Sequence, residues 1–173
     1  MKYKNYWKDI CRIHLLTKHY LLIAEEMSAD GEMFLQPLKE HRDAYDHIIR
    51  VYAAQSGMSR PDDLEHYIKS NLSKAIGHEY RAFFDTADWL SMICRDIINN
   101  VLKGTTVEEI ERKYSHYKEL KEFLLKLPEM IAEQREHKDI GSDLLTEVDQ
   151  YVELLDRLIQ YYKDLVEVFE IER

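Results

Sequence analysis

Apolar side chains recur every three or four positions along almost the whole chain, which is the period of an α-helix that buries one face. These stripes predict helices over residues 3–27 and 37–54, and a long helix that begins near 59 and ends near 102. Two further helices are predicted over 105–131 and 142–169. Five glycines and three prolines leave few turn residues for a β-rich fold. The pattern therefore predicts an all-α protein, a helical bundle of about five helices.

Several residues indicate where these helices begin and end. Ser59 or Arg60 is expected near the cap of the third helix, and Gly104 is expected to end it. Pro128 is expected to kink or split the fourth helix near its end, because proline lacks the N–H that a helix interior uses. Two pairs have the spacing of a capping box at the start of that helix, Thr105 with Glu108 and Thr106 with Glu109.

The last predicted helix has the most regular stripe. Its spacings of three and four alternate over more than three heptads, as in a coiled-coil seam. The seam consists of Leu145, Val148, Val152, Leu155, Ile159, Tyr162, Val166 and Phe169. We therefore expect residues 105–173 to form an antiparallel coiled-coil-like hairpin next to a three-helix core over residues 1–104. The hairpin either packs with the core in a single domain or projects and pairs with another chain.

Composition narrows the class of protein. The formal net charge of −9 disfavours a protein that mainly coats phosphate backbones, because that task needs a basic surface. No stretch approaches the roughly 18 uncharged apolar residues of a membrane span, and no signal peptide is visible, so no membrane contact is expected. Cys11 and Cys94 both lie in apolar helical patterns and are expected to be buried thiols of a cytoplasmic protein.

The spacing of histidines and carboxylates gives no metal motif within one helix. Eight histidines are present, but neither Glu-x-x-His nor His-x-x-x-His occurs. A glycine-rich phosphate loop and a Gly-x-Ser-x-Gly turn are also absent from the sequence. No metal and no other cofactor are therefore expected.

One short motif in the second predicted helix points to a reaction. The segment Arg42-Asp-Ala-Tyr-Asp-His47 resembles the Arg-polar-x-x-x-His motif of the HEPN superfamily. Those proteins are small helical bundles that commonly dimerise, and many are metal-independent ribonucleases of toxin and defence systems. The resemblance implies that Arg42 stabilises phosphate charge and His47 acts as acid or base. On a helical wheel His47 lies with polar residues, so the alternative is a solvated histidine paired with Asp43.

Three ionisable residues interrupt apolar stripes. His14, Arg42 and Glu79 each lie within the stripe of a different predicted helix. Because a buried charge is tolerated only when it is paired, we expect Arg42 and Glu79 to form a buried ion pair with His14 within reach. Such a cluster either fixes the register of the helices or lines a pocket for a small ligand.

Three functions follow from these observations. The first is a non-enzymatic helical interaction or regulatory protein that homo-oligomerises as a dimer, with residues 145–169 as the contact for a protein partner. The second is a HEPN-type ribonuclease or an inactive relative that uses Arg42 and His47, and only this one makes RNA a partner. The third is a small-molecule sensor whose pocket contains His14, Arg42 and Glu79.

Overall fold

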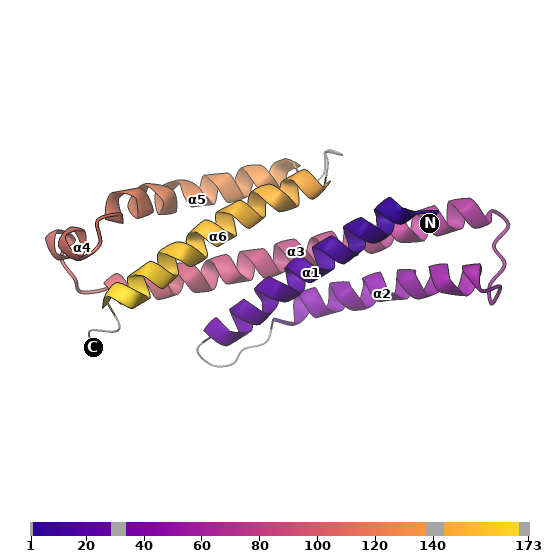
Figure 1. Ribbon diagram of the computed structural model, residues 1–173, viewed down its shortest axis with the longest axis horizontal. Helices are drawn as coiled ribbons and strands as arrows, with labels where there is room; N and C mark the ends of the chain where they lie inside the picture. The colour runs from indigo at the N-terminus through magenta and orange to yellow at the C-terminus, as the bar shows by residue number, and fades with distance from the viewer. Residues whose placement is uncertain (1, 29–33, 138–143, 170–173) are drawn as a thin grey trace. The chain divides into compact units, whose positions relative to one another are not determined.

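The described part of the chain is built from α-helices. A computed structural model describes residues 2–28, 34–137 and 144–169, and every regular element in them is an α-helix (Figure 1). This confirms the predicted all-α class. The helices are α1 (Lys4–Met27), α2 (Leu35–Gln55), α3 (Leu64–Leu102), α4 (Val107–Lys113), α5 (Tyr117–His137) and α6 (Leu144–Phe169).

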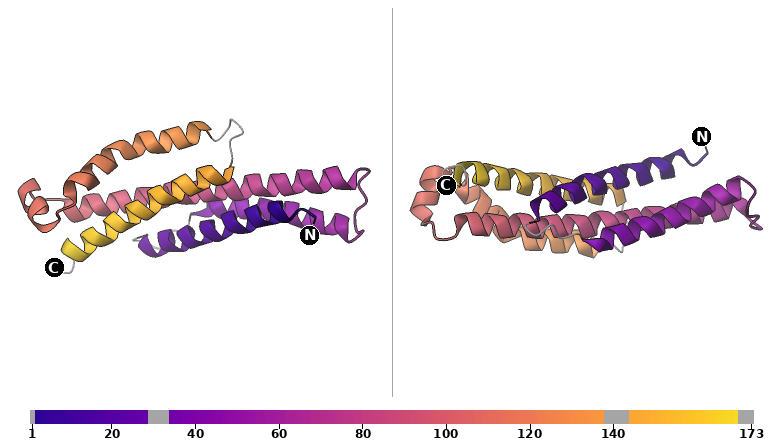
Figure 2. Two further views of the ribbon diagram at one scale, coloured as in Figure 1. Left: turned by 45° about the horizontal axis from the view of Figure 1, so that its top comes forward. Right: turned by 90° about the horizontal axis from the view of Figure 1, so that it is seen from below.

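The segment predicted as one helix from residue 105 is two helices. The chain leaves the helical conformation at Tyr114, whose φ of −126° and ψ of 98° are extended, and α5 starts three residues later. Pro128, where a kink or break was expected, lies inside α5. Figure 2 shows that α5 curves along its length. A curved helix is one way to relieve the clash of a proline ring with the preceding turn.

The start of α3 differs from the prediction. The side chain of Asp63 accepts a hydrogen bond from the backbone N–H of His66 at 3.0 Å, so Asp63 caps the helix instead of Ser59 or Arg60. A carboxylate at this position satisfies a backbone donor that the first turn leaves unpaired, and its charge is favourable at the positive end of the helix dipole.

The connection from α3 to α4 follows the sequence signals more closely. Gly104 has a φ of +83°, a left-handed conformation that glycine adopts without steric cost. The hydroxyl of Thr106 then accepts a hydrogen bond from the backbone N–H of Glu109 at 3.3 Å, so the second of the two predicted pairs is the one that caps. The predicted start of the last helix at residue 142 lies outside the described residues.

The chain divides into two compact units, Met1–Leu90 and Ser91–Arg173. The division falls inside α3, whereas the sequence pattern predicted that the three-helix core ends at residue 104. In the first unit α1 and α2 pack against α3. The largest side chains with no more than 2% exposure there are Ile13, Tyr20, Leu72, Phe83, Phe84 and Leu90.

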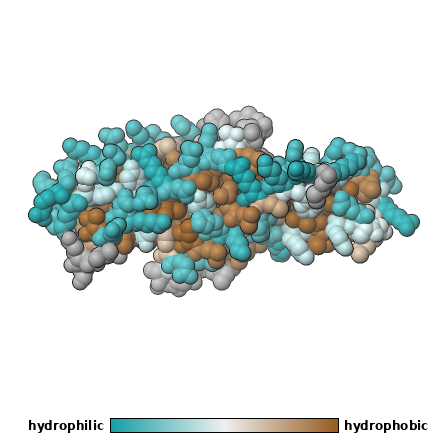
Figure 3. All heavy atoms as spheres, in the orientation of Figure 1, coloured by the Kyte–Doolittle hydropathy of each residue, from teal (hydrophilic) through white to brown (hydrophobic). Residues whose placement is uncertain are grey.

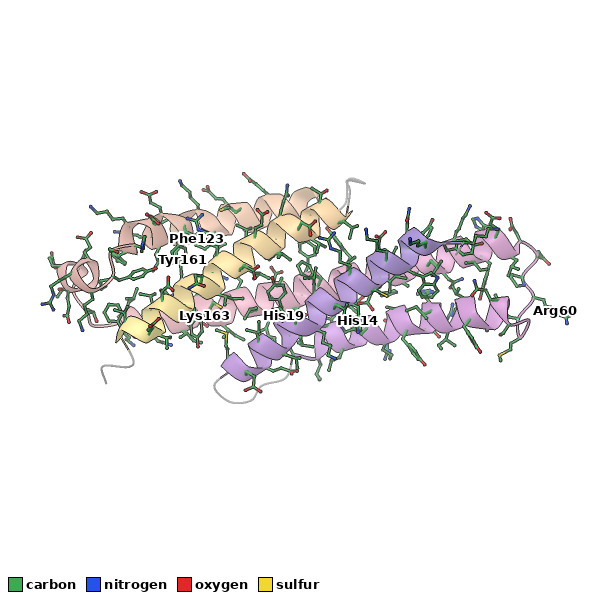
Figure 4. The ribbon with its side chains drawn as sticks, in the orientation of Figure 1. His14, His19, Arg60, Phe123, Tyr161 and Lys163 are labelled. Carbon is green, nitrogen blue, oxygen red and sulfur yellow. The ribbon has the colours of Figure 1, made fainter. Side chains whose placement is uncertain are left out.

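The second unit places α5 next to α6, and the two helices run in opposite directions (Figure 1). The rings of Phe123 on α5 and Tyr161 on α6 lie 5.5 Å apart between centroids, and the guanidinium of Arg157 lies 4.8 Å from the Phe123 centroid. Figure 4 labels both aromatic residues. Along α6 the seam residues are buried or half-buried.

Hydrophilic side chains cover much of the face drawn in Figure 3, with hydrophobic residues visible between them. Within the described part of the chain, no helix combines the length and the hydropathy needed to cross a bilayer.

Two leucines on α5 provide a matched test of this packing. Leu120 is fully buried, whereas Leu125 is 70% exposed. We expect Leu120→Ala to lower the free energy of unfolding by about 2–5 kcal/mol, because it removes buried methyl groups and leaves a cavity. Leu125→Ala should change it by less than about 0.5 kcal/mol. Urea denaturation followed by circular dichroism measures both, and similar losses for the two variants would contradict the placement of α5.

Candidate functional site

The first unit holds a buried carboxylate between two histidines. Glu79 on α3 is only 3% exposed. Nδ1 of His14, on α1, lies 3.2 Å from both carboxylate oxygens, and Nδ1 of His41, on α2, lies 3.0 Å from Oε2. The two imidazole rings are 4.6 Å apart between centroids. These three residues form what we call the Glu79 cluster, and Figure 4 labels His14 where α1 passes the other two helices.

Helical spacing explains why the three side chains meet. Glu79 follows Leu72 and Ile76 at intervals of seven and three residues, so its side chain shares their buried face of α3. His14 lies between the buried residues Ile10 and Thr17 on α1 by the same rule. A carboxylate is therefore held in the core by the apolar residues around it, and each neighbouring helix contributes one imidazole.

One nitrogen of this cluster is not satisfied. Nδ1 of His41 is buried and has no hydrogen-bond partner, although it lies 3.0 Å from Glu79 Oε2. A buried polar atom without a partner costs about 1–3 kcal/mol. Such an atom is uncommon in folded proteins and calls for an explanation.

A cavity of about 320 Å³ opens onto the Glu79 cluster. Apart from the three cluster residues it is lined mainly by apolar groups. The other lining residues are Ile10, Cys11, Leu15, Tyr45 and Ile48. The cluster is thus accessible from one side, where His14 keeps 45% of its side chain exposed, while Glu79 stays covered.

A second carboxylate in the same unit is already neutralised by a cation. Glu40 Oε2 on α2 lies 2.8 Å from His78 Nδ1 and accepts a hydrogen bond from Arg81 Nε at 2.9 Å, both from α3. Burial raises the pKa of Glu40, but the hydrogen bonds and charges of His78 and Arg81 together outweigh that effect and hold the pKa below its usual value. We call these three residues the Glu40 cluster.

His47 belongs to the same region of α2 and α3. Its ring stacks on that of His78 with 5.4 Å between centroids, and its Nδ1 lies 2.9 Å from Asn71 Oδ1. Because the Asn71 amide nitrogen donates to the Tyr67 carbonyl, the Asn71 oxygen is the acceptor and His47 Nδ1 carries the proton. The residue expected to pair with His47, Asp43, instead accepts hydrogen bonds from Arg42.

The predicted ion pair between Arg42 and Glu79 is corrected by the structure. Arg42 keeps 71% of its side chain exposed and donates to Asp43 Oδ1 at 2.7 and 3.0 Å. The hydrogen bond from Arg42 lowers the pKa of Asp43. The next residue back, His41, contacts Glu79 instead. The structure thus brings His14 and Glu79 together and leaves Arg42 outside their cluster.

Arg42 lies outside the cluster because α2 turns a different face toward the core from the one that its bulky residues suggested. The apolar stripe that contains Arg42 is exposed, and the helix turns a face of mostly small residues toward the core. The buried residues of α2 are Pro37, Glu40, Ala44, Val51 and Ala54. Glu40 has the spacing of that face, four residues before Ala44, so the positions of the small residues in the sequence indicate that Glu40 points inward.

Arg42 and His47 do share a surface hollow of about 510 Å³. Asp43, Tyr45, Asp46, Ile49 and His78 complete its lining. The two carboxylates there limit how much positive potential Arg42 offers to a phosphate group.

The two cysteines differ in accessibility. Cys94 is buried, and burial raises the pKa of its thiol to about 12. Cys11 is exposed and lines the cavity at the Glu79 cluster, which corrects the expectation that both thiols are buried.

No family model, no curated protein and no solved structure matches this chain. The chemistry available to the site is therefore inferred from its own residues.

The Glu40 cluster predicts a pH dependence of stability. The pKa of Glu40 in the folded protein lies below the usual 4.5, so folding favours its ionised form. That contribution is present above the usual pKa and is lost as the pH falls through the folded value. Glu40→Gln should therefore lower the free energy of unfolding by about 1–3 kcal/mol at pH 7.

Urea denaturation at pH 7 and at pH 3 measures this effect, and we expect the difference from the unchanged protein to shrink at pH 3. Glu26→Gln, at an exposed position on α1, is the control and should change little at either pH. A loss for Glu40→Gln that is as large at pH 3 as at pH 7 would argue against the ionised Glu40 as its source.

Proposed function

We propose that this chain is a non-enzymatic helical interaction protein that works as a homodimer joined through α2. The observation that carries the proposal is a row of large apolar side chains left on the outer face of that helix. Leu35, Leu38, Tyr45, Ile49 and Tyr52 are between 40% and 66% exposed. Single exposed apolar residues are ordinary, but a contiguous row along one helix face is typical of a protein contact.

The row has the spacing of a helix-pairing seam. Together with Arg42 it forms the α2 stripe, in which steps of three and four residues alternate from Leu35 to Tyr52. This is the pattern by which the side chains of one helix pack between those of another. On α6, by contrast, the seam at 145–169 is buried or half-buried. The contact is therefore assigned to α2, and α5 with α6 is assigned the role of a coiled-coil-like hairpin within the second unit.

A second copy of the chain is the occupant that fits the α2 stripe. Two such helices in antiparallel orientation, related by a twofold axis between Arg42 and Tyr45, match residues of complementary size and charge. The facing pairs are Leu35 with Tyr52, Leu38 with Ile49 and Arg42 with Tyr45, and Lys39 lies next to Asp46 of the partner subunit. Each Arg42 guanidinium then stacks on a tyrosine ring, a favourable cation–π contact.

We also propose a cytoplasmic location. Cys11 and Cys94 are free thiols, as is usual for proteins of a reducing compartment.

Ile49→Asp tests the dimer. A carboxylate at this position of the stripe would face Leu38 of the partner subunit without a polar partner, which is unfavourable in a desolvated contact. We expect the unchanged protein to sediment as a dimer at micromolar concentration and Ile49→Asp to sediment as a monomer. Leu125→Asp, at an exposed position on α5, is the control and should remain dimeric. A strict monomer for the unchanged protein at about 100 µM would refute the proposal.

Disulfide cross-linking of cysteine variants tests whether the two α2 helices of the dimer are antiparallel. Leu38→Cys and Ile49→Cys chains, each with Cys11 and Cys94 changed to serine, should form a disulfide when the two are mixed and oxidised, because the two positions face each other. Leu38→Cys alone should not form one. Efficient cross-linking of Leu38→Cys to itself would instead indicate parallel helices.

A ribonuclease of the HEPN type is a second candidate, because Arg42 and His47 line the same hollow. If this candidate holds, the protein cleaves labelled single-stranded RNA in the presence of EDTA, and His47→Ala lowers the rate by at least about 100-fold, the scale of a lost acid–base catalyst. His116→Ala, in the second unit, is the control for contaminating nucleases. Equal cleavage by all three proteins would exclude this candidate.

A further inference from the structure

We propose that His14, His41 and Glu79 bind a divalent transition-metal ion. The sequence showed no metal motif within any one helix, but here each of three helices supplies a single ligand. Such a site produces no characteristic spacing along the chain. The proposal is independent of the dimer through α2.

The separations of the candidate ligand atoms suit a metal site. One atom from each residue lies within 4.8 Å of the other two, and the His–Glu separations are 3.2 and 3.0 Å. An ion with bonds of about 2.0–2.2 Å in tetrahedral geometry has ligand atoms about 3.3–3.5 Å apart. The two His–Glu separations are therefore close to those between two ligands of one ion, and the rings would adjust when the ion binds.

The unsatisfied nitrogen of His41 supports the same conclusion. Its Nδ1 is buried and lies near Glu79 without a hydrogen bond. A metal ion would use the lone pair of that nitrogen and one oxygen of the carboxylate at the same time. This removes the cost of the unpaired atom and neutralises the buried charge of Glu79.

The Glu40 cluster provides the comparison within the same unit. Its carboxylate also has a histidine neighbour, but the Arg81 guanidinium already supplies the cation at 2.9 Å. Among the described residues, Glu79 has no arginine or lysine partner and is contacted by the imidazoles of His14 and His41. The first carboxylate is thus neutralised by the protein, whereas the second has a place for an external cation.

The ligand set indicates the class of metal. Two imidazoles and one carboxylate are typical of zinc with a free fourth position and of non-haem iron(II). The cavity of about 320 Å³ borders the cluster, so the free positions face a space with walls formed by Ile10, Leu15 and Ile48. Water or a small, largely apolar ligand with one donor atom fits that side of the ion.

The test measures metal binding by the purified, intact chain after dialysis against EDTA. Titration calorimetry with Zn²⁺ should show one site per chain, and Co²⁺ should give visible absorption of the intensity expected for four or five ligands. His14→Ala should weaken binding at least about 100-fold, since even the loss of a group that only orients a ligand costs 10–100-fold. Because the His14 side chain is half-exposed, we expect this variant to fold, and circular dichroism checks that it does.

His78→Asn is the matched control, because it removes a histidine from the Glu40 cluster and should leave Zn²⁺ affinity unchanged. Glu79→Gln, which keeps the shape of the side chain and removes its charge, should also lose the site. The proposal is overturned if the unchanged protein binds none of Zn²⁺, Co²⁺ and Fe²⁺ at one per chain. It is equally overturned if folded His14→Ala and Glu79→Gln bind as tightly as His78→Asn.

Discussion

The burial of one carboxylate constrains the arrangement of the whole first unit. Glu79 lies in the apolar face of α3, where its charge is tolerated only with partners close by. Those partners come from α1 and α2, so the three helices must be in register to within a fraction of a turn. A slip of one residue on α2 would replace His41 with Glu40 or Arg42. The cluster therefore specifies how the helices pack, besides any ligand that it binds.

The two carboxylates of this unit show how the same residue types lead to different chemistry. Glu40 and His41 are neighbours on α2, as His78 and Glu79 are on α3, and each glutamate contacts a histidine of the other helix. The two clusters differ in their third residue. Arg81 makes the Glu40 cluster a self-contained ion pair, whereas the third member of the Glu79 cluster is a second imidazole, that of His14.

The sequence predicted the fold class and most helices because their apolar periodicity is strong and local. The prediction was wrong where either of two faces of one helix could be the buried one. The bulky residues of α2, such as Tyr45 and Ile49, suggested the buried face, but alanines and Glu40 occupy it. That error placed Arg42 in the core and hid His41, so only His14 and Glu79 of the site were found. A site assembled from three helices depends on their relative rotation, which spacing along one helix does not reveal.

Tyr45 forms part of the wall of both the hollow at Arg42 and the cavity at the Glu79 cluster. A side chain shared in this way cannot be repositioned on one side without reshaping the other. If a partner chain covers the outer face of α2 and a ligand enters the cavity, both would contact Tyr45. Where the two favour different positions of that ring, each would change the affinity for the other by the same factor. The position of one phenol ring would then relate the assembly of the chain to the affinity of its cavity.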